Sequence, residues 1–121
     1  MTVLDASAIL AFIQNETGAA RVERELKDRA TCSAVNWAEV AQKVRAAGHD
    51  WARASALLRS YELDVTADTV DDAELAADLW QRGSGLSLAD RLCLALGQRL
   101  QQKVLTADGA WAGMPGVELL R

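Results

Sequence analysis

The chain begins with Thr2-Val3-Leu4-Asp5-Ala6-Ser7, and the fold that we expect follows from this stretch. A β-branched and aliphatic run of this length is typical of a strand buried on both faces, as in a parallel sheet covered by helices. Asp5 would stand at the carboxyl end of that strand. Ligands bind along this edge in open α/β sheets, because the βα loops and helix N-termini gather there. Asp5 is therefore the first candidate for a functional residue.

The composition predicts one compact domain over residues 1–121. Half of the residues are hydrophobic and a quarter are charged, a mixture typical of globular proteins. A chain of this length buries roughly two thirds of the surface that its unfolded form exposes. No apolar run approaches the ~18 residues of a membrane span, and Asp5 stands where a signal peptide would need apolar residues. We therefore expect a cytoplasmic protein without a membrane partner.

The charge and the few reactive side chains exclude several classes of function. A formal net charge of -4 argues against passive binding to nucleic acid through a broad basic face. Cys32 and Cys93 lie far apart and lack CxxC spacing, which indicates buried free thiols rather than metal or redox sites. His49 is the only histidine, in a predicted turn between helices. Chemistry that needs a pair of histidines is thus excluded.

The hydrophobic pattern alternates between the periods of strands and helices. After the first strand, further strands are expected at 30–35, 63–65, 103–105 and 117–120. Helices are expected at 8–13, 18–28, from Asn36 to Gly48, from Asp50 to about 60, at 69–82, and from Ser87 to about 100. The fourth helix should bury Ala54, Leu57 and Leu58. The last helix follows a break at Gly83-Ser84-Gly85 and should cross the core, because Leu88, Leu92, Leu96 and Leu100 recur at i+4 steps. Strands that alternate with helices pair in parallel through right-handed crossovers. The fold class is thus α/β, a three-layer α/β/α sandwich with a mainly parallel central sheet of four to five strands.

Polar residues before each helical pattern are candidate N-caps. We expect Ser7, Thr17, Asn36, and either Thr66 or Asp68 to cap the first, second, third and fifth helices. The fifth helix should bury Ala73, Ala76, Ala77 and Trp80. Its many acids (Asp68, Asp71, Asp72, Glu74 and Asp78) should form a solvated face near the helix N-terminus, without chemistry.

Four carboxylates stand at comparable places in this scheme. Asp5 and Asp108 end apolar strands, whereas Glu39 and Asp90 lie in the first turns of helices with buried faces. Helix capping explains each acid alone. Glu39 could form a capping box with Asn36, and Asp90 could form one with Ser87. Together they converge on one end of the sheet, where they would repel one another unless a cation intervenes. Mg²⁺ and Mn²⁺ prefer such oxygen ligands.

Four motifs carry a specific resemblance to a known family. They are Val-Leu-Asp-Ala-Ser at 3–7, Val-Asn-Trp-Ala-Glu-Val at 35–40, Leu-Ser-Leu-Ala-Asp-Arg-Leu-Cys-Leu-Ala-Leu-Gly at 86–97, and Val-Leu-Thr-Ala-Asp at 104–108. In this order and spacing the chain resembles PIN-domain nucleases and, more narrowly, the VapC toxins of bacterial type II toxin-antitoxin pairs. The resemblance covers essentially the whole chain, whose length matches a free-standing toxin.

The resemblance implies a metal-dependent endoribonuclease that inhibits translation until an antitoxin neutralises it. It makes Asp5, Glu39, Asp90 and Asp108 the catalytic, metal-binding quartet for Mg²⁺ or Mn²⁺, with Ser7 and Thr106 as supporting hydroxyls. In this hypothesis Asp5 is the central ligand and Asp90 and Asp108 complete the cage. Glu39 binds a second ion or orients the attacking water.

Two further side chains near the quartet have competing interpretations. Arg91 is a candidate for contact with RNA, but a solvated helix face or an ion pair explains it as well. Trp111 could stack on a base, or it could pack the last turn onto the sheet.

The resemblance also implies the partners. VapC-like proteins are homodimers bound by a VapB-like antitoxin, and DNA contact comes only through the antitoxin. The apolar surfaces of the first and third helices would suit the groove that receives the antitoxin. The RNA substrate (tRNA, rRNA or mRNA) stays open at this point. Two alternatives also stay open, a non-catalytic interaction module and a DNA-directed nuclease on the same fold.

Overall fold

The computed structural model describes all residues, 1–121, and has strands and helices in alternation. The strands are β1 (Thr2–Leu4), β2 (Ala30–Ser33), β3 (Asp64–Thr66), β4 (Lys103–Thr106) and β5 (Val117–Leu119). The helices are α1 (Ala6–Ile13), α2 (Ala19–Lys27), α3 (Ala34–Ala46), α4 (Trp51–Ser60), α5 (Val70–Asp78) and α6 (Leu88–Leu100), with a 3₁₀ turn η1 (Gly109–Trp111). Every element expected from the sequence is present. None of the helices is long and apolar enough to cross a membrane.

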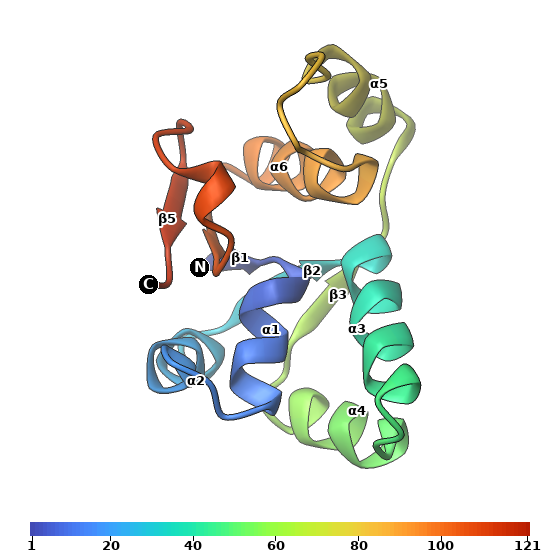
Figure 1. Cartoon of the computed structure of the whole chain (residues 1–121), viewed down its shortest axis with the longest axis vertical. Helices are drawn as coiled ribbons and strands as arrows, with labels where there is room; N and C mark the ends of the chain where they lie inside the picture. Colours follow the sequence, from blue (N-terminus) through green and yellow to red (C-terminus); the bar gives the residue numbers. More distant parts are fainter.

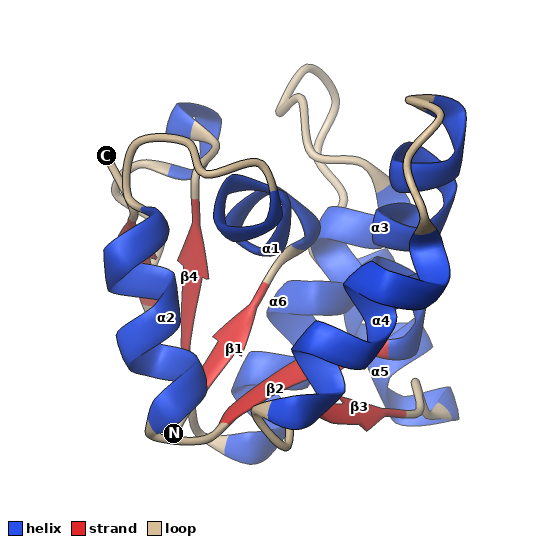
Figure 2. Ribbon diagram, turned by 90° about the horizontal axis from the view of Figure 1, so that it is seen from below, coloured by secondary structure: helices blue, strands red, loops and turns tan.

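The five strands form one parallel sheet in the order β3-β2-β1-β4-β5 (Figure 2). The chain therefore builds outward from β1 in one direction and then crosses back to add β4 on the other side of β1. The strand order reverses between β1 and β4. In open parallel sheets such a switch point opens a crevice at the carboxyl ends of the two strands. This crevice is where Asp5 leaves β1.

Helices cover both faces of the sheet, which confirms the three-layer sandwich. Leu4 and Leu105 point to one face and pack with α1, α2, α3 and α4, whereas Val3 and Val104 point to the other face and pack with α6. The alternation follows from the two-residue period of a strand. Figure 1 shows α5 beyond α6, as an outer element that is farther from the sheet. The candidate edge is thus held between two apolar cores.

Helix α6 lies unusually close to β4. Residues 92–97 of α6 are all buried, as the i+4 pattern of leucines predicted for a helix that crosses the core. Gly97 makes the approach possible, because a Cβ at that position would lie 2.6 Å from Cγ2 of Val104. The contact sets the position of the whole helix, and so of Asp90 in its first turn.

The helix starts differ from the predicted caps at four places. Asp5 rather than Ser7 caps α1, and α2 begins after Gly18 without a side-chain cap, so the Thr17 prediction is wrong. Ser33 rather than Asn36 caps α3, and Thr69 caps α5 in a capping box with Asp72. Adjacent polar residues compete for each helix end, and the tertiary path of the chain decides which one is placed to accept the free N–H groups.

The buried face of α5 is also not the predicted one. Ala76 is buried, but Ala73 and Ala77 are exposed and Trp80 is 54% exposed. The residue that α5 buries beside Ala76 is Asp72, at 1% exposure. The prediction that all acids of this helix lie on a solvated face is therefore wrong for Asp72.

An ion pair explains why Asp72 is buried. Arg99 of α6 donates to both carboxylate oxygens of Asp72, at 2.8 and 3.1 Å. Burial opposes the charged form, but these hydrogen bonds outweigh it and lower the pKa of Asp72. α5 is thus attached to α6 by a polar contact as well as by apolar packing.

Two exposed leucines correct the predicted apolar stripes of α4 and α6. Leu57 was expected to face inward, but it is 45% exposed, and Leu88 is 58% exposed. Leu58, Leu92 and Leu96 are buried as expected. Leu57 lies on a different face of α4 from its neighbour Leu58, whereas Leu88 begins α6 ahead of the buried residues 92–97.

Candidate active site

Asp5 is the centre of the candidate site and is only 4% exposed. Its Oδ1 accepts a hydrogen bond from the backbone N–H of Ala8 at 2.8 Å, which caps α1. The Ser7 hydroxyl donates to the two carboxylate oxygens at 2.7 and 2.9 Å, and the Thr106 hydroxyl donates to Oδ2 at 2.5 Å. A carboxylate at the end of a buried strand is therefore surrounded by donors from both sides of the crevice.

The two hydroxyls also join the turn after β1 to the turn after β4. Ser7 Oγ accepts from the backbone N–H of Ala107 at 2.9 Å and lies 3.2 Å from Thr106 Oγ1. Thr106 Oγ1 accepts from the backbone N–H of Asp108 at 3.0 Å. The crevice is thus rigid at its base, because each hydroxyl binds a carboxylate and a backbone group together. The structure brings Asp5, Ser7 and Thr106 into direct contact.

The charge on Asp5 is unfavourable in this place. Burial raises the pKa of Asp5, the hydrogen bonds from Thr106, Ala8 and Ser7 lower it, and the charge of Asp90 raises it further. The net effect is a raised pKa. A neighbouring cation would reverse this balance, since it favours the charged form of a carboxylate.

The buried thiols of Cys93 and Cys32 respond to the charges of several predicted acids. Burial raises the pKa of Cys93, and the nearby charges of Asp5, Asp90 and Glu39 raise it further. Burial also raises the pKa of Cys32, and the charges of Asp5, Asp68 and Glu39 raise it further. Both thiols are free and buried, as expected. The charges of Asp5 and Glu39 thus act on both thiols, and that of Asp90 acts on Cys93.

Glu39 lies on α3, half-buried, with one hydrogen bond to its side chain. Asn36 Nδ2 donates to Glu39 Oε2 at 3.2 Å. The capping box predicted between these two residues is absent, because Ser33 caps the helix. The role of Asn36 as a donor to Glu39 was not predicted. The three-residue spacing is compatible with such a contact on a helix, but the spacing alone does not show that the amide is buried and oriented.

Asp90 and Asp108 both make the capping contacts that the sequence suggested. Asp90 accepts from the backbone N–H of Ser87 at 2.9 Å in a capping box, and it is half-buried. Asp108 is exposed and accepts from the backbone N–H of Ala110 at 2.9 Å. In each case the second carboxylate oxygen has no hydrogen-bond partner. The backbone N–H of Asp108 donates to Thr106 Oγ1, whereas the Asp108 carboxylate binds the backbone of η1.

The four candidate acids have suitable oxygen ligands for a divalent ion, but their side chains do not lie close enough together to form a complete metal site. Asp5, Glu39, Asp90 and Asp108 offer carboxylate oxygens of the kind that Mg²⁺ and Mn²⁺ prefer, and three of them keep one oxygen free. A cation beside Asp5 would favour the charged carboxylate and so oppose the burial that raises the pKa of Asp5. No three His, Cys, Asp or Glu side chains lie close enough to hold a metal ion. The quartet as a complete ligand set therefore stays a prediction.

A fifth carboxylate, Asp68, stands at the same edge of the sheet, just after β3. Its Oδ2 accepts from the backbone N–H of Val35 at 3.2 Å, in the first turn of α3, and its Oδ1 is buried without a partner. Burial raises its pKa. The expected roles of Asp68, a cap for α5 or a member of a solvated face, are both wrong. It anchors the start of α3, the helix that carries Glu39.

Arg91 and Trp111 both make contacts within the protein. Arg91 Nη1 donates to the backbone oxygen of Ala76 at 2.7 Å, and its Nε is buried without a partner. The solvated face and the ion pair that competed for Arg91 are thus absent, and its contact with RNA stays a prediction. Trp111 is fully buried in the core beside Val3, which confirms packing for this residue.

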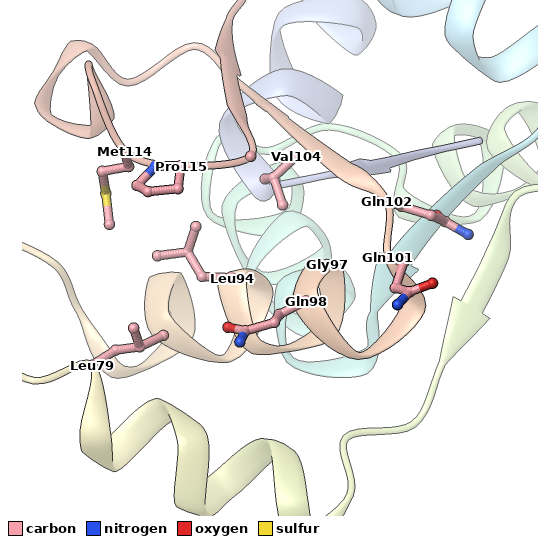
Figure 3. Close-up of a pocket in the computed structure, with 10 residues that line it drawn as sticks. Leu79, Leu94, Gly97, Gln98, Gln101, Gln102, Val104, Met114 and Pro115 are labelled. Carbon is pink, nitrogen blue, oxygen red and sulfur yellow. The ribbon is translucent and has the colours of Figure 1, made fainter.

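A separate pocket of about 660 Å³ has none of the candidate acids in its lining (Figure 3). Leu94, Gly97 and Gln98 of α6 line one side of it, and Met114 and Pro115 line another. The pocket reaches the amino ends of the strands, where β4 begins, and has no ionisable side chain in its lining. It is therefore not part of the candidate site.

The family model described as PIN domain matches residues 2–116. The chain belongs to the PIN domain family. PIN domains are generally nucleases. Among curated proteins, none matches this sequence.

Solved structures of toxin-antitoxin proteins share the fold of this PIN domain. A toxin-antitoxin complex from Klebsiella pneumoniae has a TM-score of 0.80 at 20% identity, with coverage of 100% of this chain and 98% of that one. VapC20 of Mycobacterium tuberculosis, described as a toxin that cleaves the sarcin-ricin loop, has a TM-score of 0.75 at 16% identity and 95% coverage of both chains. VapBC2 from Rickettsia felis, bound to a promoter DNA fragment, has a TM-score of 0.69 at 16% identity, covering 98% and 96%. These likenesses confirm the predicted PIN-like fold of VapC toxins.

Proposed function

We propose that this PIN domain is a metal-dependent endoribonuclease and the toxin of a type II toxin-antitoxin system. The observation that carries the proposal is the placement of Asp5. It lies buried at the switch point between β1 and β4, with donors from both turns and with the charge of Asp90 near enough to raise its pKa. A carboxylate kept in such a costly place is typical of functional sites.

The chemistry is hydrolysis of a phosphodiester bond in RNA. Asp5, Asp90 and Asp108 would hold Mg²⁺ or Mn²⁺, which supplies positive charge to the reacting phosphate and activates a water. Ser7 and Thr106 orient the Asp5 carboxylate through their hydroxyls. Glu39 keeps one oxygen free to bind a second ion or to accept a hydrogen bond from the attacking water.

The proposed partners follow from the structural neighbours. The Klebsiella neighbour is a toxin-antitoxin complex and VapC20 is described as a toxin that cleaves the sarcin-ricin loop, so we expect a VapB-like antitoxin and an RNA substrate for this chain. The Rickettsia neighbour is a VapBC assembly on promoter DNA, so any DNA contact here should come through the antitoxin. A homodimer in the cytoplasm completes the proposal.

The test is cleavage of total RNA by purified protein, with the new RNA ends mapped by sequencing. Cleavage should require Mg²⁺ or Mn²⁺ and stop with a chelator. Asp5→Asn and Asp90→Asn should each lower the rate by at least ~100-fold, since several kcal/mol of transition-state stabilisation depend on the ligands. Asp71→Asn, which changes an exposed acid of α5, is the matched control and should cleave like the wild type.

The result also separates the alternatives. Cleavage that ignores chelation, or that Asp5→Asn leaves intact, would remove the quartet from the mechanism. Binding of an antitoxin without any cleavage would favour the non-catalytic module, in which Asp5, Asp90 and Asp108 act only as helix caps. Metal-dependent cleavage of DNA but not of RNA would favour the DNA-directed nuclease.

A further inference from the structure

Asn36 is a buried amide whose side chain is not needed to begin its helix. It is 1% exposed and lies in the first turn of α3. The free backbone N–H of Asn36 is already bound by the Ser33 hydroxyl oxygen at 3.0 Å, which is the N-cap contact. Burying a primary amide is costly unless its groups are bonded, so the side chain must have other partners.

The partners of that amide fix its orientation. The Ser33 hydroxyl donates to Asn36 Oδ1 at 2.9 Å, so the amide oxygen faces Ser33. The amide nitrogen then faces the opposite way, where it donates to Glu39 Oε2 at 3.2 Å. The serine thus sets the direction of the amide, and the amide sets the direction of the carboxylate.

Glu39 has no other hydrogen bond or ion pair to hold its side chain. A glutamate that is free to rotate loses side-chain conformational entropy when it becomes ordered, and this loss opposes ligand binding. Contact with a fixed amide reduces that loss before any ligand arrives. The start of α3 is itself anchored, because Asp68 of the neighbouring loop accepts from the backbone N–H of Val35.

We propose that Asn36 is a positioning residue that aims the Glu39 carboxylate into the crevice beside Asp5. The inference rests on the proposed function and deepens it, because it assigns a role to a residue outside the acidic quartet. Asn36 acts through Glu39 and has no contact with the substrate. Its effect on activity must therefore disappear when Glu39 is absent.

The test is a double-mutant cycle with Asn36→Ala and Glu39→Ala. Two quantities are measured for each purified protein: the affinity for Mn²⁺ by isothermal titration calorimetry, and the single-turnover rate of RNA cleavage. Glu39→Ala should lower the Mn²⁺ affinity, the cleavage rate or both. Asn36→Ala should lower the same quantity by about tenfold, as expected for a residue that orients a metal ligand. The double variant should be no weaker than Glu39→Ala alone.

Two further variants separate positioning from folding. Thr31→Val removes another buried side-chain hydrogen bond of β2, to Gln102, and should lower stability without changing either quantity. Asn36→Asp keeps the shape of the amide but lacks the donor, so it should weaken the same quantity as Asn36→Ala even where the fold is intact by circular dichroism.

The outcomes overturn distinct statements. If Asn36→Ala and Asn36→Asp match the wild type, or if the effect of Asn36→Ala persists in full beside Glu39→Ala, the positioning role is wrong while the nuclease proposal stands. If the wild type neither binds Mn²⁺ nor cleaves RNA, the proposed function fails, and the positioning role fails with it.

Discussion

At the scale of a single residue, Asp5 combines contacts that oppose each other in energy. The backbone N–H of Ala8 and the hydroxyls of Ser7 and Thr106 stabilise the carboxylate, whereas burial and the charge of Asp90 destabilise it. Because the pKa is raised overall, the unfavourable effects win. The folded protein without a cation thus carries a charge at a cost in stability, as is common at functional sites.

The raised pKa of Asp5 predicts how stability depends on pH. Between the ordinary value of 3.8 and the raised value, the folded state keeps a proton that the unfolded state has lost. The contribution of Asp5 to stability is therefore fully present below 3.8 and is lost as the pH rises through the folded pKa. Asp5→Asn should remove this loss and raise the free energy of unfolding at pH 7.

Urea denaturation in the presence of chelator, from pH 4 to pH 8, checks this expectation. Asp71→Asn is the control, because that carboxylate is exposed. An Asp5→Asn variant that is less stable than the wild type at pH 7 would mean that the capping contact to Ala8 outweighs the burial of the charge.

At the scale of elements, the contact between α6 and β4 determines where Asp90 lies relative to Asp5. Gly97 has an ordinary helical conformation, so its importance comes from space and not from backbone freedom. The neighbours of an added Cβ would be Val104 Cγ2 at 2.6 Å and the backbone oxygen of Gln102 at 3.2 Å. The backbone oxygen cannot move without disturbing the start of β4.

Gly97→Ala should therefore destabilise the protein by about 1–3 kcal/mol, as overpacking does in a tight core. The helix propensity of Ala acts in the opposite direction by up to about 1 kcal/mol, which is less than the strain. Thermal or urea unfolding measures the change.

The compensating variant is Gly97→Ala together with Val104→Ala. Removing the Val104 methyl groups gives the new Cβ room, so the double variant should be more stable than the sum of the two single changes indicates. Strictly additive effects would show that the clash does not occur and that α6 shifts away from β4 at little cost.

At the scale of the whole molecule, the acidic charge is concentrated in one part of the chain. Seven of the 17 acidic residues lie between Arg59 and Arg82, a stretch without Lys or Arg, so the remaining residues carry an excess of positive charge. The net charge of -4 therefore describes mainly α5 and the segment before it. It does not argue against RNA contact elsewhere on the molecule, where cations can reach the phosphate backbone.

If the crevice binds a divalent ion, folding and ion binding are linked. Mn²⁺ at ten times its dissociation constant should raise the free energy of unfolding of the wild type by about 1.4 kcal/mol. Asp5→Asn should show little of this increase. The measurement is thermal unfolding with MnCl₂, against NaCl at matched ionic strength, and an equal increase in both proteins would place the ion elsewhere.

Much of the fold could be read from the sequence, because the information was local. The apolar run before Asp5, the leucine period of α6 and the break at Gly83-Ser84-Gly85 each depend on neighbours in the chain. The same holds for Asp5 and Asp108, which follow strands, and for Asp90 in the first turn of α6. The first-turn prediction for Glu39 was wrong, because Ser33 rather than Asn36 caps α3 and Glu39 is therefore the sixth residue of that helix. The PIN and VapC motifs carried the resemblance that the family model and the solved structures then confirmed.

Details that involve distant partners were not predictable in the same way. Asp72 was assigned to a solvated face because its partner Arg99 lies 27 residues away. The cap of α3 was placed on Asn36, whereas Ser33 takes that role and frees the Asn36 amide to face Glu39. Each error concerns a polar side chain with several possible partners, and only the packed chain selects one.

Residue types at short spacings were enough to predict the alternation of strands and helices, the family, and the places of Asp5, Asp90 and Asp108 near strand and helix ends. The tertiary structure decided the strand order that opens the crevice between β1 and β4, and the contacts of Ser7 with Thr106 across 99 residues. It also decided how deeply Asp5 is buried, and therefore the sign of its pKa shift. Burial and hydrogen bonding are properties of the assembled layers, and no local pattern specifies them.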